Sequence, residues 1–448
     1  MIYSLITIFL LLFTFITWTR FHLGLTLFFF LLPTYLIRFH IGPLPTTLLE
    51  MMFVIFFVIW TIKQNKNIIY HLSPKKDALW LSFIIKKNKL LFIGILLFIL
   101  AATFSIFTSS NTRSALGEWK AFYIEPVLMF LIIMTTLKSS NKKLINNIIF
   151  ALILSGLLTS LLAIYQHFTG WMVPEAFWAN HDTFRITAWY GFPNAVGLFL
   201  APIFPLAIYL LMHNFNELKK RNWKLFAEPT SKIPTAVGIS CILFLTISPL
   251  AIFFTKSTGA LIGLIAGISI LLLFYKKTRI ITLVILASGI FTLILLPSSN
   301  PIKQELLLQD RSGQIRLSMW SNTFEFLKDH PIKGAGLASY SEKIIPYHTT
   351  VNGEGIEIFH HPHNIFLTMW VNLGLLGLVS FTLILIWFFK TSLLRSMLRN
   401  NSTVFILSSI VIIIIMGLVD SPYIKNDLAM FFWLLPTLLI INTQSKSA

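Results

Sequence analysis

The sequence predicts an all-α membrane protein, a polytopic bundle of about 12–13 transmembrane helices. Of its 448 residues, 56% are hydrophobic and 12% are charged, whereas about a quarter of the residues in a soluble domain are charged. Apolar runs of about 20 residues, long enough to cross the roughly 30 Å hydrocarbon layer, recur along the whole chain. These runs do not alternate apolar and polar residues as the strands of a membrane barrel do, so we read them as helices.

The predicted spans follow one another closely along the chain. We place them at residues 2–19, 23–38, 44–62, 90–109, 119–137, 144–166, 191–212, 235–254, 259–275, 280–297, 366–388, 402–420 and 427–442. The first two are short, and the side on which the N-terminus lies depends on whether both of them cross. The first has no basic residues before it and no small-residue cleavage site, so we expect no removable signal peptide. The chain 1–448 is predicted to be a single transmembrane domain.

Lysine and arginine divide the connecting loops into two classes. The basic loops, which hold few acids, are 63–89, 138–143, 213–234, 276–279, 390–399 and the C-terminal tail. Short cytoplasmic loops carry such an excess, so we expect the loops near 109–118, 167–190 and 298–365 to face outward. The formal charge of +18 is then a consequence of topology, and no nucleic-acid binding is expected.

The segment 298–365 is the one large insertion between predicted spans, and we expect it to form an outer loop with short helices. Within it, Trp320, Phe324 and Leu327 recur at helical spacing. This stripe predicts a helix that lies against the membrane domain. Pro331 should end the helix, because proline disfavours helical geometry in the residue before it.

Three histidines, His360, His361 and His363, stand immediately before the next span. Their spacing matches no common zinc signature, so we expect no metal site. A histidine whose pKa lies near neutrality can accept a proton or hydrogen-bond a substrate, and this is the role that we favour. Metal binding, and a surface loop that merely contains histidines, are the alternatives.

Four arginines depart from the rule that outer loops are poor in basic residues: Arg113, Arg185, Arg311 and Arg316. The planar guanidinium group suits bidentate contacts with phosphate. Taken singly, each of them could instead contact a lipid headgroup or form a salt bridge, such as Asp310 with Arg311. Together with a histidine they predict an outer site for a lipid-linked pyrophosphate.

Acidic side chains at or near the spans are further candidates, because charged groups are costly there. Glu118 and Glu125 lie at the outer end of one predicted span, and Glu50 and Asp420 are isolated. We expect each to be as suited to capping or pairing with a neighbouring helix as to acting on a substrate. The single cysteine, Cys241, excludes an intrachain disulfide.

The run HNIFLTMWVNLGLLG, which begins at His363, resembles the histidine motif of the O-antigen ligase and polymerase family. The segments RLSMW at 316–320 and HPIKGAG at 330–336 precede it in the order that the family shows, and Arg185 followed by GFPN at 191–194 resembles an earlier family segment. The resemblance covers roughly residues 110–440. Within the histidine motif we expect Gly374 to allow close helix packing and not to touch substrate.

One position departs from the family pattern. Many members have Ser-Arg-Gly where this chain has Lys256-Ser257-Thr258-Gly259, so that Thr258 stands in place of the arginine. Lys256 supplies a positive charge two residues away, but an ammonium group is a point charge without the bidentate fork.

The resemblance implies an enzyme of polysaccharide or lipopolysaccharide biosynthesis in the cytoplasmic (inner) membrane. It would be a metal-independent glycosyltransferase without a cofactor, taking a glycan from undecaprenyl pyrophosphate to a sugar acceptor on the outer face. The acceptor would be a growing glycan for a polymerase and a lipid A core for a ligase. The implied catalytic residues are Arg185 and Arg316, for the leaving pyrophosphate, and His363, for the acceptor hydroxyl. The substrate-binding candidates are Arg113, Lys256, Arg311 and Asn364, the last of which is also placed to cap a helix.

A transporter or flippase of lipid-linked sugars is the alternative from a different class. It too would need basic groups that face a cavity, but it predicts charges through the depth of the membrane and repeat symmetry. The unusual polar groups here gather in the outer loops, which favours an enzyme.

Overall fold

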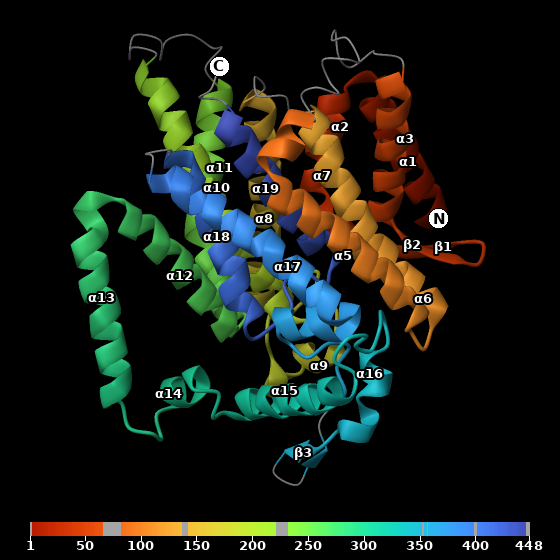
Figure 1. The fold of residues 1–448 in the computed structure, drawn as a ribbon. Helices are drawn as coiled ribbons and strands as arrows, with labels where there is room; N and C mark the ends of the chain where they lie inside the picture. The colour runs from red at the N-terminus through yellow and green to blue at the C-terminus, as the bar shows by residue number, and fades with distance from the viewer. Residues whose placement is uncertain are drawn as a thin grey trace.

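The computed structural model describes residues 2–65, 82–136, 142–220, 232–351, 354–355, 357–397 and 401–444. It is an all-α polytopic bundle, as predicted (Figure 1). The strands of the described residues form two short hairpins, β1 (Arg38–Ile41) with β2 (Leu44–Thr47) and β3 (Thr350–Val351) with β4 (Glu354–Gly355). Within these described ranges, seven helices are long and apolar enough to cross a membrane, and shorter apolar helices accompany them.

Each predicted span overlaps a helix, although the second does so only in part. In the first half these helices are α1 (Ile2–Thr19), α2 (Phe21–Phe30), α3 (Leu48–Asn65), α5 (Lys89–Phe107), η2 (Trp119–Ile124) with α7 (Glu125–Thr136), and α8 (Lys142–Thr169). In the second half they are α10 (Pro193–Lys220), α11 (Lys232–Phe254), α12 (Thr258–Phe274), α13 (Lys276–Leu295), α17 (Ile365–Met397), α18 (Asn401–Gly417) and α19 (Asn426–Gln444). Much of the predicted basic loops, residues 66–81, 137–141, 221–231 and 398–400, lies outside the described residues.

The second predicted span differs from the structure. Helix α2 has 10 residues, which rise only about 15 Å, and it ends before Pro33, where the 3-10 turn η1 (Leu32–Leu36) takes over. Proline disfavours helical geometry in the residue before it. The chain therefore returns through a helix, a turn and the β1–β2 hairpin, and not through one continuous span.

The N-terminus lies at the hairpin end of the bundle. The ring of Tyr3 contacts Phe39 of β1, with centroids 6.5 Å apart. At the other end of α1, the Lys63 ammonium donates to the Trp18 carbonyl at 2.5 Å. Helix α1 thus runs the length of α3, from the hairpin to the end at which α3 finishes.

The inserted segment covers one end of the bundle, away from the C-terminus (Figure 1). Helix α15 (Arg311–Asp329) lies across this end, with α14 (Pro301–Leu306) before it and α16 (Tyr340–Lys343) after it. Several hydrogen bonds join the segment to α6 (Thr112–Glu118) and to the residues before it. Among them, Ser109 Oγ lies 2.9 Å from Ser339 Oγ, and the Ala338 N–H donates to Glu118 at 2.9 Å. Two of the loops predicted to share a side of the membrane therefore meet.

The buried face of α15 differs from the predicted stripe. Leu327 is buried and Trp320 is partly buried, but Phe324 is 47% exposed. The buried positions of α15 are Gly313, Met319, Asn322, Thr323, Phe326 and Leu327. A periodic stripe cannot reveal that the insertion has its own small core, in which residues of 335–347 pack on α15 and turn a different face inward.

Helix α17 is broken at Gly374, where φ is 69°. The backbone of 331–336 enters the break: the Ala335 N–H donates to the Val371 carbonyl at 2.6 Å, and the Leu375 N–H donates to the Ile332 carbonyl at 3.0 Å. These bonds satisfy the groups that the break frees, as backbone inside a membrane requires. A Cβ on Gly374 would lie 2.1 Å from the Ile332 carbonyl oxygen. Gly374 thus allows a close backbone approach, but the partner is the loop 331–336 and not a neighbouring helix.

Gly374→Ala should therefore destabilise the protein. The positive φ alone costs of the order of 1–3 kcal/mol for a residue with a side chain, and the loop must also withdraw from the break. The measurement is the melting temperature in detergent. The control is Gly289→Ala in α13, where a Cβ meets nothing within 4 Å and alanine favours helix. Equal melting temperatures for the two variants would contradict the proposed docking.

Candidate functional site

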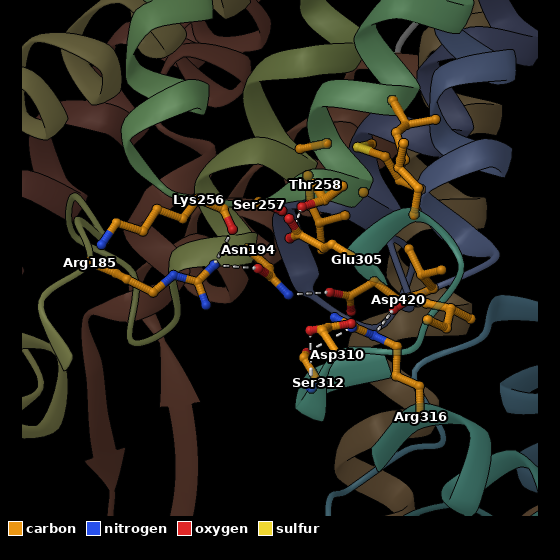
Figure 2. Close-up of a pocket in the computed structure, with 18 residues that line it drawn as sticks. Arg185, Asn194, Lys256, Ser257, Thr258, Glu305, Asp310, Ser312, Arg316 and Asp420 are labelled. Carbon is orange, nitrogen blue, oxygen red and sulfur yellow. Dashed lines mark hydrogen bonds between the residues drawn. The ribbon is translucent and has the colours of Figure 1, made fainter. Parts of the chain in front are cut away.

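A cavity of about 390 Å³ lies between α15 and the bundle (Figure 2). Four segments distant in the sequence form it: the start of α10 with the loop before it, the α11–α12 turn, the insertion before and within α15, and the turn after α18. Its polar lining is Arg185, Asn194, Lys256, Ser257, Thr258, Glu305, Asp310, Ser312, Arg316 and Asp420. The cavity thus brings together, at one end of the bundle, the ends of helices that lie far apart in the sequence.

Arg185 is held at one side of the cavity by the backbone of the α11–α12 turn. Its Nε donates to the Thr255 carbonyl at 2.8 Å, and Nη2 donates to the Lys256 carbonyl at 2.9 Å and to Asn194 Oδ1 at 3.2 Å. Lys256 has φ of 53°, a conformation uncommon outside glycine. The Lys256 amine points away from Asp420 (Figure 2).

Arg316 projects from α15 at the opposite side (Figure 2). Its Nε donates to the Val419 carbonyl at 3.0 Å and its Nη1 to Ser312 Oγ at 2.8 Å. Burial lowers the pKa of Arg185, and the nearby charge of Arg316 lowers it further. Among the described residues, no acceptor contacts Nη1 of Arg185 or Nη2 of Arg316. Two guanidinium groups that repel each other thus keep donors available for an anion.

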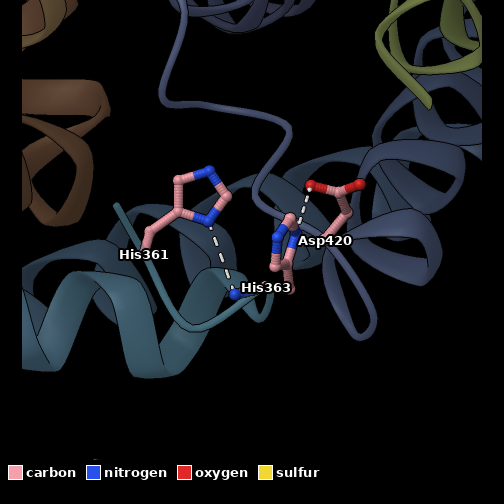
Figure 3. A group of neighbouring side chains, drawn as sticks. All are labelled: His361, His363 and Asp420. Atoms are coloured by element: carbon pink, nitrogen blue, oxygen red, sulfur yellow. Dashed lines mark hydrogen bonds and ion pairs between the residues drawn. The ribbon is translucent and has the colours of Figure 1, made fainter. Parts of the chain in front are cut away.

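Asp420 links the cavity to the histidine motif. Its Oδ1 lies 3.3 Å from His363 Nδ1, and its Oδ2 accepts from Asn194 at 3.1 Å (Figures 2 and 3). Because Asn194 also accepts from Arg185, a continuous hydrogen-bonded chain runs Arg185, Asn194, Asp420, His363. His363 itself is not part of the cavity lining and reaches it through this carboxylate.

The turn that carries His363 is fixed from both sides. His363 has φ of 45°, and strained backbone of this kind persists only where the surroundings hold it. The Trp320 indole N–H donates to the Pro362 carbonyl at 2.9 Å. Asn364 caps α17, accepting from the Phe366 and Leu367 N–H groups at 3.0 and 3.1 Å, and its amide donates to the Leu418 carbonyl at 3.0 Å.

Burial and neighbouring groups shift the pKa values of His361 and Asp420. Burial lowers the pKa of His361 to about 3, with a smaller contribution from His363 beside it. Burial would raise the pKa of Asp420, but the hydrogen bond and charge of His363 outweigh it and hold the pKa below its usual range. Ligand atoms of His361, His363 and Asp420 lie within 4.8 Å of one another, so among the described residues this group could hold a metal ion.

Two further carboxylates line the cavity. Glu305, at the end of α14, accepts a hydrogen bond from the Thr258 hydroxyl. Thr258 occupies the position where the resembled family has arginine. Asp310 caps α15, accepting from the Ser312 and Gly313 N–H groups at 3.2 and 3.1 Å. The cavity wall therefore offers both cationic donors and carboxylate acceptors.

The structure brings together only some of the residues that the sequence suggested. Arg185, Lys256 and Arg316 line the cavity, and His363 joins it through Asp420. Arg113 does not line the cavity. It donates to the Pro43 carbonyl of the β1–β2 turn. Arg311 is exposed at the start of α15, and Asn364 serves as the helix cap; neither lines the cavity.

Sequence reasoning did not assign Asp420, Asn194 or Glu305 to the site. Asp420 was recognised only as an isolated acid, and Asn194 only as part of a family segment. An isolated acid next to a span was the available signal, because burying such a charge calls for a partner. The partner itself, 57 residues earlier, could not be read from the sequence.

A family model described as O-antigen ligase matches residues 241–382. The matched region contains the α11–α12 turn, the whole insertion with α15, and the histidine motif. No curated protein sequence matches the chain.

Asn364 should act mainly through its cap. Asn364→Ala is expected to cost about 0.5–2 kcal/mol of folding free energy, because two helical N–H groups lose their acceptor. Asn364→Ser restores a capping oxygen without the amide and should recover most of the loss. Thermal unfolding in detergent measures both variants. If serine were no better than alanine, the bond to the Leu418 carbonyl, and not the cap, would be the main contribution.

Proposed function

We propose that this chain, whose residues 241–382 match the O-antigen ligase family model, transfers a glycan from undecaprenyl pyrophosphate to a sugar acceptor at the outer face of the cytoplasmic membrane. The observation that carries the proposal is the cavity in which Arg185 and Arg316 converge next to the Asp420–His363 pair. The transfer needs no metal ion in this proposal. The acceptor is a growing glycan or a lipid A core.

The mixed charge of the cavity suits a glycosyl pyrophosphate. The open guanidinium donors of Arg185 and Arg316 fit pyrophosphate oxygens, since arginine contacts phosphate in a planar, bidentate way. The carboxylates Glu305 and Asp310 would repel any anionic group beyond the pyrophosphate but accept hydrogen bonds from sugar hydroxyls. A ligand with an anionic end and a hydroxyl-rich end therefore fits the wall better than a simple anion does.

The chemistry assigned to the site is a displacement at the anomeric carbon. The acceptor oxygen forms a bond to that carbon while the bond to the pyrophosphate oxygen breaks. Negative charge grows on the pyrophosphate, and Arg185 and Arg316 stabilise it without reorganisation. His363 takes the proton of the acceptor hydroxyl through Nε2, since Asp420 on Nδ1 orients the ring and stabilises the imidazolium that forms.

The outer location is supported by the charges of the chain. The insertion with α15 lies at the end of the bundle opposite the C-terminus (Figure 1), and the basic loops of the sequence connect the other helix ends. In the described part of the chain, the polar residues that line the cavity come from one end of the bundle, which favours a transferase over a transporter with charged groups through the depth of the membrane.

Cysteine labelling tests this location. Cys241 is buried, so single cysteines can be added to the native chain. Ile345→Cys, at an exposed position of the insertion, should react with a membrane-impermeant maleimide in cells whose outer barrier has been opened. Lys277→Cys, at the start of α13, should react only after the inner membrane is permeabilised. The reverse pattern would place the cavity in the cytoplasm and refute the proposed function.

Substitutions at the cavity separate charge from geometry. Arg316→Lys keeps the charge but loses the fork that contacts Val419 and Ser312, and should reduce transfer about 10²–10³-fold, the usual loss for one oxyanion donor. His363→Ala should reduce transfer by about 10²–10⁴-fold, the contribution of a general base. The measurement is glycan transfer in membranes, normalised to the amount of folded protein.

Two matched variants control these measurements. His360→Ala removes an exposed histidine of the same turn, and Arg395→Lys makes the same exchange at the far end of α17; both should retain near-normal transfer. If His363→Ala keeps more than about a tenth of the activity, general-base catalysis by this residue is excluded.

A further inference from the structure

Three side chains able to bind metal meet at the edge of the cavity, His361, His363 and Asp420 (Figure 3). We propose that they form an inhibitory site for a divalent transition-metal ion of the Zn²⁺ type. Metal binding by itself does not depend on the proposed function, whereas its inhibitory effect rests on His363 being the base in that function.

The donor atoms select the class of ion. Two imidazole nitrogens and one carboxylate oxygen suit Zn²⁺ and its neighbours in the first transition row, while Mg²⁺ and Ca²⁺ prefer oxygen ligands alone. Zinc bonds of about 2.0–2.2 Å place two ligands of one tetrahedral ion about 3.3 Å apart. The His363 Nδ1 to Asp420 Oδ1 distance is 3.3 Å, and all three ligand atoms lie within 4.8 Å. Small side-chain rotations would therefore complete the set.

The surroundings already orient these ligands. Asp420 is held by the Asn194 amide at 3.1 Å and by the Ser421 N–H at 2.8 Å. Such outer contacts to a ligating carboxylate are a regular part of metal sites. The side chains of His363 and Asp420 remain 20% and 11% exposed, which leaves a path for an ion to enter.

An ion bound here would remove the proposed base from catalysis. Metal on Nδ1 of His363 breaks the contact with Asp420 that sets the ring tautomer, and metal on Nε2 occupies the nitrogen that takes the proton. In either case the acceptor hydroxyl loses its base. The site thus inhibits a reaction that itself needs no metal, and chelation should leave transfer unchanged or increase it.

His361→Asn is the discriminating variant. The Nδ1 of His361 accepts from the His363 N–H at 3.4 Å, and the amide oxygen of asparagine occupies a similar place, so the turn keeps its internal contact while one metal ligand is lost. His360→Asn is the matched control, because His360 is exposed and outside the cluster.

The experiment titrates purified full-length protein with Zn²⁺ by calorimetry and records the absorption of bound Co²⁺ as a second signal. Wild type and His360→Asn should bind one Zn²⁺ each. His361→Asn should bind at least about 100-fold more weakly, since losing even an outer contact costs about 10–100-fold. Low concentrations of Zn²⁺ should inhibit transfer by wild type and His360→Asn but not by His361→Asn, and EDTA should reverse the inhibition.

Equal Zn²⁺ affinity in wild type and His361→Asn would overturn the proposed site. Inhibition that persists unchanged in His361→Asn would overturn its inhibitory role. If the binding pattern holds but His363→Ala retains transfer, the assignment of His363 as base fails while the metal site stands. If EDTA abolishes transfer, the metal-independent reaction and the inhibitory role both fail.

Discussion

The site depends on the partners of one buried carboxylate. Asp420 follows α18 at the end of the bundle, where an unpaired charge would be costly. Its two oxygens are satisfied by His363 and Asn194, which belong to segments far from it in the sequence. Because Asn194 also contacts Arg185, the need to satisfy one carboxylate fixes the relative positions of α10, α17 and the turn after α18. The same contacts align the groups assigned to chemistry.

A second constraint, which acts through the backbone, places Arg316 at the cavity. The break at Gly374 would leave polar groups of α17 unpaired inside the bundle, and the backbone of 331–336 satisfies them. That segment directly follows α15. Docking it in the break therefore holds α15 across the end of the bundle and places Arg316 opposite Arg185. A glycine distant from the cavity thus determines the distance between two of its arginines.

The charge pattern of the cavity explains how this chain can depart from the resembled family at Thr258. Where an arginine is expected, the Thr258 hydroxyl contacts Glu305. The remaining guanidinium groups, on Arg185 and Arg316, lie on opposite sides of the cavity with carboxylates between them (Figure 2). Such a wall fits the proposed glycosyl pyrophosphate, whose phosphate and hydroxyl groups are spatially separated.

The sequence by itself determined the all-α membrane fold, because apolar length and the cost of unpaired backbone in lipid leave few alternatives. It also indicated Arg185, Arg316 and His363, through a local motif. Tertiary structure alone decided that Asp420 is the partner of His363, that Arg113 serves the β1–β2 turn, and which face of α15 is buried. The physical reason is that composition and periodicity are local properties of the chain, whereas a buried charge or a broken helix is satisfied by whichever distant group the packing brings within hydrogen-bonding distance.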